Sequence, residues 1–94
     1  MTDYRPIACS QYSELEVLAL QRVRVTLVGT DEAGAEVVLT GTIVDLVTRD
    51  HAEYLVLENT AGRHSLRLDR LDEIRDGEAR VLWRQKTDRS QWAD

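Results

Sequence analysis

Three side chains in this sequence are of the types that perform covalent or metal chemistry: Cys9, His51 and His64. Cys9 could be a nucleophile with either histidine as its base, because a thiol becomes reactive when a neighbouring group lowers its pKa. The same three residues could bind a metal, but no two of them have the close spacing of a ligand pair. The sequence also lacks a nucleophile elbow and a phosphate-binding glycine loop. We therefore expect a structural thiol, and neither catalysis, a metal nor a cofactor.

The charged residues are more informative than the cysteine and the histidines. The 94-residue chain has a formal net charge of −5. The stretch 31–53 holds six acidic residues against one arginine, Arg49; they are Asp31, Glu32, Glu36, Asp45, Asp50 and Glu53. Affinity for nucleic acid comes largely from neutralising phosphates, so an acidic domain is a poor RNA binder and a better partner for a basic protein. Composition therefore predicts a protein-binding module.

Two local patterns leave alternatives open. Asp45 follows Gly41 late in a predicted strand, where its carboxylate could meet a partner or accept hydrogen bonds from nearby backbone amides. Arg22 and Arg24 alternate with apolar residues and could form an RNA-contacting patch together with the basic C-terminal segment. The second pattern keeps an RNA-binding module as the alternative function.

The hydrophobic pattern predicts one N-terminal helix and five strands. Tyr12, Leu15, Val17, Leu18 and Ala19 recur near the helical period, after Ser10 or Ser13 as N-cap. Apolar residues alternate in the stretches 22–28, 35–48, 52–58, 64–68 and 79–84, as in strands with one buried face. Residues 70–77 resemble a turn. Gly41 interrupts the longest strand, which indicates a bend, a bulge or a close backbone approach.

These elements predict a mainly β fold with one N-terminal α-helix: a small, strongly bent, five-stranded antiparallel barrel of Sm-like or OB-like kind. We expect one domain at 1–85 and a flexible polar tail at 86–94. No apolar run approaches the roughly 20 residues that span a bilayer, and the first residues do not resemble a secretory signal. One cysteine cannot form an internal disulfide, which fits a reducing cytoplasm.

Five short motifs follow one another between residues 4 and 75. They are Tyr4-x-Pro6-Ile7-x-Cys9, Tyr12 with Leu15-Glu16, Asp45-Leu46-Val47, Glu53-Tyr54-Leu55 and Leu66-Arg67-Leu68-Asp69. Together they resemble the bacterial Rho-binding antiterminator (Rof, or YaeO) family. The resemblance implies an Sm-like barrel with an N-terminal helix. It also implies a protein that binds the hexameric termination factor Rho at its primary RNA-binding sites and so lowers Rho-dependent termination.

The same resemblance implies where Rho would be bound. The family's Rho-facing surface corresponds to the first helix and to the loop after the bent strand. In this chain these are Tyr12, Glu14, Leu15 and Glu16, and Arg49, Asp50 and His51. We expect Glu14, Glu16 and Asp50 to pair with basic residues of Rho. We also expect a free monomer with no direct contact to nucleic acid or membrane; the alternatives are an Sm-like RNA-binding ring and an acidic adaptor for another basic protein.

Overall fold

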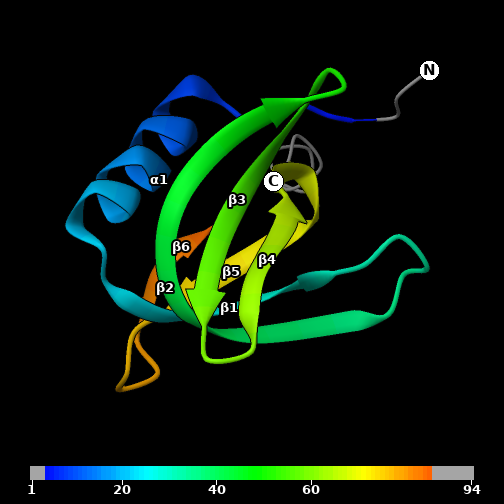
Figure 1. Cartoon of the computed structure of the whole chain (residues 1–94). Coiled ribbons are helices and arrows are strands. Elements are labelled where there is room, and N and C mark those ends of the chain that lie inside the picture. The colour runs from blue at the N-terminus through cyan, green and yellow to red at the C-terminus, as the bar shows by residue number, and fades with distance from the viewer. Residues whose placement is uncertain (1–3, 86–94) are drawn as a thin grey trace, which may run out of the picture.

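The structure, a computed structural model, describes residues 4–85 as one helix and a bent antiparallel sheet (Figure 1). The elements are α1 (Cys9–Gln21), β1 (Arg24–Thr30), β2 (Glu36–Arg49), β3 (Ala52–Asn59), β4 (Gly62–Arg67), the 3-10 turn η1 (Leu68–Arg70), β5 (Leu71–Arg75) and β6 (Val81–Arg84). The six strands are ordered β4-β3-β2-β1-β5-β6. The predicted class is confirmed, with six strands instead of five. The predicted tail at 86–94 lies outside the described residues.

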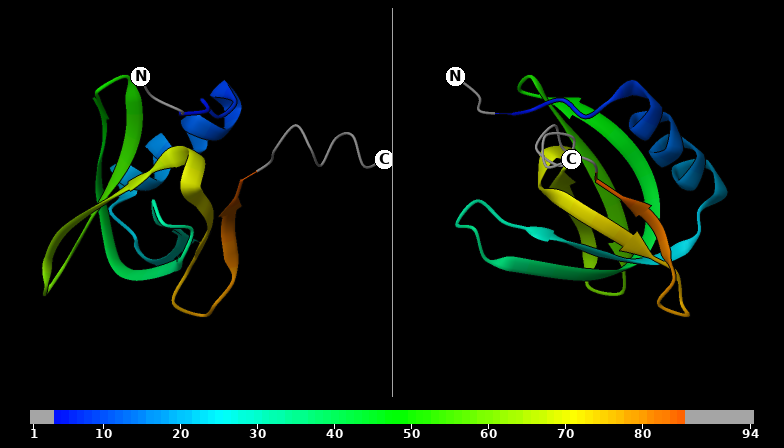
Figure 2. Two further views of the ribbon diagram at one scale, coloured as in Figure 1. Left: turned by 90° about the vertical axis from the view of Figure 1, so that its right-hand side faces the viewer. Right: turned by 180° about the vertical axis from the view of Figure 1, so that it is seen from behind.

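The sheet is curled but does not close, since β4 and β6 are its two edges in the described part of the chain. β5 and β6 lie behind β2, β3 and β4 in Figure 1, and the view from behind in Figure 2 brings them to the front. Helix α1 lies beside β2. The buried core lies between these layers and includes Leu27, Ile43, Leu57 and Trp83. No helix within residues 4–85 is long and apolar enough to cross a membrane.

Helix α1 is held by a narrow buried stripe. Gln11 and Leu15, four residues apart on one helical face, are its buried residues. The Gln11 side chain donates a hydrogen bond to the Arg84 carbonyl at 2.8 Å, which ties the helix to β6. The predicted serine N-caps are wrong: the cap is Ala8, with no side-chain hydrogen bond. The helix ends at Arg22, whose backbone is left-handed with φ 52°.

Strand β2 behaves as two strands joined at a bend. Its first half, up to Thr42, pairs with β1, and its second half, from Thr42, pairs with β3. A Cβ on Gly41 would lie 2.4 Å from the Glu58 carbonyl oxygen, so β3 can approach only because residue 41 has no side chain. Val44 is then a bulge, opposite no residue of β3. The expected special role of Gly41 is a close backbone approach.

The predicted turn at 70–77 is wrong, because residues 71–75 form β5. Leu71 and Ile74 are both fully buried although they are three residues apart. A register shift explains this spacing: Gly29 pairs with Leu71 and Val28 with Glu73, so Asp72 is an extra residue in the strand. A bulge of this kind hides the alternation by which a strand is recognised from sequence.

Candidate functional site

The helix residues predicted to face a partner do not all lie on the surface. Glu14 and Glu16 are exposed and Tyr12 is half-buried. Leu15 is 0% exposed and belongs to the core. Its prediction as a partner contact is therefore wrong: an apolar stripe identifies one helical face, and Leu15 lies at the centre of the face that packs on the sheet.

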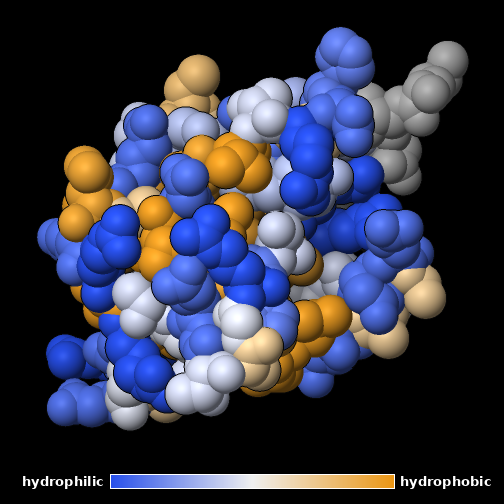
Figure 3. Space-filling model, viewed as in Figure 1, coloured by the Kyte–Doolittle hydropathy of each residue, from blue (hydrophilic) through white to orange (hydrophobic). Residues whose placement is uncertain are grey.

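A groove runs between α1 and the bent part of β2, where Figure 3 shows apolar surface bordered by charged side chains. Its volume is about 330 Å³. We call it the acidic groove; its lining residues are Tyr12, Glu16, Ala19, Leu20, Arg22, Val44, Asp45 and Leu46. Leu20 is 84% exposed although it is apolar. The groove thus combines apolar side chains with a carboxylate from each wall, Glu16 of α1 and Asp45 of β2.

The pKa of Tyr12 is affected by the negative charges around this groove. This pKa is raised above the usual value first by burial, and then by the negative charges of Glu53, Glu16 and Asp45. These carboxylates come from three different elements, β3, α1 and β2. Negative charge from three elements therefore acts on the same half-buried phenol.

Glu53 is fixed by the segment that precedes the helix. The Tyr4 hydroxyl donates a hydrogen bond to Glu53 Oε1 at 3.0 Å. Burial, together with this bond and the Glu53 charge, raises the pKa of Tyr4. The Arg5 backbone amide donates to Asp69 Oδ2 at 3.2 Å, and Arg67 lies beside the same carboxylate at 2.6 Å. The segment before the helix is therefore anchored to β3 and η1, and Glu53 contacts Tyr4 while its charge also acts on Tyr12.

Arg49, Asp50 and His51 are at the exposed tip of the β2–β3 hairpin. Asp50 and His51 both have left-handed backbones, with φ 52° and 65°, as a two-residue hairpin turn requires. The guanidinium of Arg49 lies 4.3 Å from the centre of the Tyr54 ring, in cation–π contact. The turn displays one acid and one histidine, and Arg49 is already held by its own aromatic partner.

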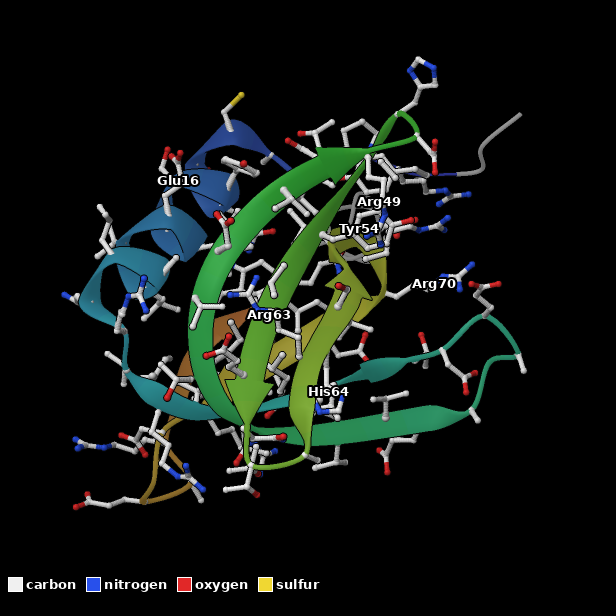
Figure 4. All side chains as sticks on the ribbon, in the orientation of Figure 1. Glu16, Arg49, Tyr54, Arg63, His64 and Arg70 are labelled. Carbon is white, nitrogen blue, oxygen red and sulfur yellow. The ribbon has the colours of Figure 1, made fainter. Side chains whose placement is uncertain are left out.

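The predicted contact residues of α1 and those of the β2–β3 hairpin do not line the same pocket. Glu16 and Arg49 lie on opposite sides of β2 in Figure 4, and no residue of the hairpin tip lines the acidic groove. Asp45 does line it, and its Oδ1 also accepts the Leu46 amide at 2.8 Å. Both readings of Asp45 are therefore compatible with its position. Glu53 was missed as a site residue, because its effect on Tyr12 depends on contacts between distant parts of the chain.

The cysteine and the histidines remain apart from this surface. Cys9 is exposed at the first position of α1. His64 Nε2 lies 3.2 Å from Asn59 Oδ1, within hydrogen-bond distance. In the part of the chain that the structure describes, no three histidine, cysteine, aspartate or glutamate residues gather as a metal site would need.

Comparisons with known proteins agree with the motifs in the sequence. A family model described as a modulator of Rho-dependent transcription termination matches residues 6–81. A solved structure titled YaeO bound to magnesium, from Vibrio cholerae O395, superposes with a TM-score of 0.57. It is 24% identical and covers 71% of this chain and 83% of its own, so it supports the fold. A search of curated proteins found no significant match.

Proposed function

Because the chain belongs to the family of modulators of Rho-dependent transcription termination, we propose that it inhibits termination by occupying the primary RNA-binding sites of the Rho hexamer. The acidic groove is the contact surface in this proposal. The observation that carries it is the groove itself, in which Glu16 of α1 and Asp45 of β2 lie with Tyr12 beside the exposed Leu20. The raised pKa of Tyr12, caused by burial and then by nearby carboxylates, agrees with this. The protein would keep RNA from loading and would perform no chemistry of its own.

An RNA-binding surface must be basic, because it neutralises phosphates with lysine and arginine. The acidic groove offers carboxylates to the same cations. Its apolar lining residues Ala19, Leu20 and Leu46 suit the aliphatic stems of lysine and arginine. These stems pack on apolar surface while the charged ends reach a polar partner. Competition with RNA then follows from charge, without any resemblance in shape between the protein and RNA.

The contact set is revised from the one expected from sequence. Tyr12 and Glu16, which line the groove, remain in it, and Asp45 joins them. Glu14 is exposed on the same helix outside the groove and is kept as a neighbouring contact. Leu15 is left out because it supports the helix from beneath. Arg49, Asp50 and His51 are proposed as a second, smaller contact at the tip of the β2–β3 hairpin, outside the acidic groove.

A competition titration tests this proposal. Labelled single-stranded RNA is bound to purified Rho, the protein is added, and RNA release is followed by fluorescence anisotropy. We expect displacement that weakens as salt is raised, since exposed charges are screened. Failure to displace RNA, at protein concentrations where direct binding to Rho is also absent, would overturn the proposal.

A further inference from the structure

A second groove lies against the acidic groove and has the opposite charge. Its volume is about 390 Å³, and we call it the arginine groove; its lining residues are Arg22, Arg24, Thr42, Val44, Glu58, Asn59 and Thr60. Arg22 and Val44 line both grooves. The two therefore form one continuous surface, with the end of α1 and the β2 bulge between them.

Strand register places the polar side chains of this groove in one row. Arg24 is opposite Thr42, Thr42 is opposite Glu58, and Glu58 is opposite Arg63. Directly opposite residues of antiparallel strands project from the same face of a sheet. The row thus crosses β1, β2, β3 and β4, and it presents Arg24 beside a hydroxyl on the outer face.

The charge in the row is unbalanced. Glu58, the acid of the groove, pairs with Arg63 at 2.7 Å, so its charge is already partly offset. Within residues 4–85 neither Arg22 nor Arg24 forms an ion pair. Both are exposed. Two unpaired guanidinium groups beside one groove are unexpected on a chain of net charge −5.

The remaining lining residues match an anion that accepts hydrogen bonds. The hydroxyls of Thr42 and Thr60 are donors at the groove. The Asn59 side chain stabilises the wall of the groove by hydrogen bonds to the backbone: it donates to the Thr40 carbonyl at 2.8 Å and accepts from the Ala61 amide at 2.9 Å. Guanidinium groups with hydroxyls are the donor set that recognises phosphate. No aromatic ring lines the groove, so it offers no platform on which a base could stack.

We propose that the arginine groove is a binding site for phosphate groups, either those of the backbone of a single RNA strand or those of a free polyphosphate. Arg22 and Arg24 supply the charge, and Thr42 and Thr60 supply neutral donors. The proposal does not depend on Rho: it concerns the free protein, and it stands or falls separately from the competition with RNA on Rho.

The test uses the full chain at low salt and two probes, an eight-nucleotide oligouridylate followed by anisotropy and inorganic pyrophosphate followed by calorimetry. The variant is Arg22→Gln/Arg24→Gln. Its matched control is Arg80→Gln/Arg84→Gln, which removes the same two charges from exposed positions on and beside β6. The single variant Arg24→Gln leaves the end of α1 unchanged. It therefore still tests the groove if the double variant does not fold.

We expect both probes to bind the wild type, and the double variant to lose at least about tenfold in affinity for both, as loss of two charge-assisted phosphate contacts predicts. Arg24→Gln should lose part of this affinity, and the control variant should lose about twofold or less. Binding of pyrophosphate alone, with the same dependence, supports the site and assigns it to free polyphosphate. Binding of neither probe, or equal loss in variant and control, overturns it.

Discussion

The acidic groove and the arginine groove share Arg22 and Val44 but are built differently. The acidic groove has a helix for one wall, and Tyr12 is half-buried there under the influence of three carboxylates. The arginine groove is made mainly by side chains in register across neighbouring strands, and its two arginines are exposed. A groove with a helix as one wall can select a partner by its shape as well as its charge. A row of exposed side chains selects mainly by charge. We therefore expect the acidic groove to be the more selective surface and the arginine groove the more sensitive to salt.

The largest effect should come from the bend that both grooves share. In Gly41→Ala the new methyl group would lie 2.4 Å from the Glu58 carbonyl oxygen and 2.8 Å from Leu57 Cδ2. Because backbone must move to relieve this, we expect a loss of about 2–4 kcal/mol in the free energy of unfolding. Thermal and urea unfolding measure it. Gly77→Ala is the control, since no atom lies within 4 Å of a Cβ there; equal stability of the two variants would contradict the role given to Gly41.

The bend also shows what could be read from the sequence and what could not. Gly41 within an alternating stretch indicated a special position, and most of the strands followed from alternation alone. The residue that β3 approaches, Glu58, is 17 positions away, and only the folded sheet identifies it. Val44 in β2 and Asp72 in β5 are extra residues that break the alternation locally. In the short strand β5 this one residue is enough to hide the pattern, so the sequence predicts a turn there.

The candidate site was predicted in part for a similar reason. Helical spacing and acidity located Tyr12, Glu14 and Glu16 on one element. Spacing alone does not say which residue of an apolar stripe is fully covered, so Leu15 was assigned to the surface. Glu53 acts on Tyr12 through its charge and accepts a hydrogen bond from Tyr4, which is 49 positions away from it in the sequence. Contacts of that sequence separation depend on the tertiary fold and leave no local pattern.

Charge reversal at the acidic groove should give the next largest effect. In Glu14→Lys/Glu16→Lys, Glu16 lines the groove and Glu14 is two residues before it on the same helix. Both altered side chains are exposed, so the fold should persist. Rho binding should weaken at least about tenfold, which is about 1.4 kcal/mol, because cations would then face cations. Calorimetry with purified Rho measures it. Glu32→Lys/Glu78→Lys makes the same change of charge at exposed positions outside both grooves; if it weakened binding equally, net charge and not the groove would explain the effect.

Arg22 gives a sharper test, because it belongs to both grooves. Arg22→Gln removes a cation from the acidic groove and a phosphate ligand from the arginine groove. We expect affinity for Rho to rise and affinity for pyrophosphate to fall, each by about two- to fivefold, as for single charges at exposed sites. Both are measured by titration on one protein sample. A change of the same sign in both titrations would mean that the two grooves do not act separately.

The smallest effect concerns the ionisation of Tyr12. Burial is the largest cause of its raised pKa, and the charges of Glu53, Glu16 and Asp45 follow. Glu16→Gln/Asp45→Asn should therefore lower this pKa without returning it to the usual value. The sign for stability follows from linkage: a raised folded-state pKa contributes stability below the unfolded pKa of about 10, and this is lost as pH rises through the folded value. Tyr12 in the folded double variant should thus ionise at a lower pH than in the wild type. The loss of stability should begin near the same unfolded pKa in both proteins and be complete at a lower pH in the variant. NMR titration of labelled tyrosine separates Tyr12 from Tyr4 and Tyr54. Glu58→Gln, in the arginine groove, should leave the Tyr12 curve unchanged; a shift as large as that of the double variant would show that the phenol senses the charge of the whole domain and not that of its own groove.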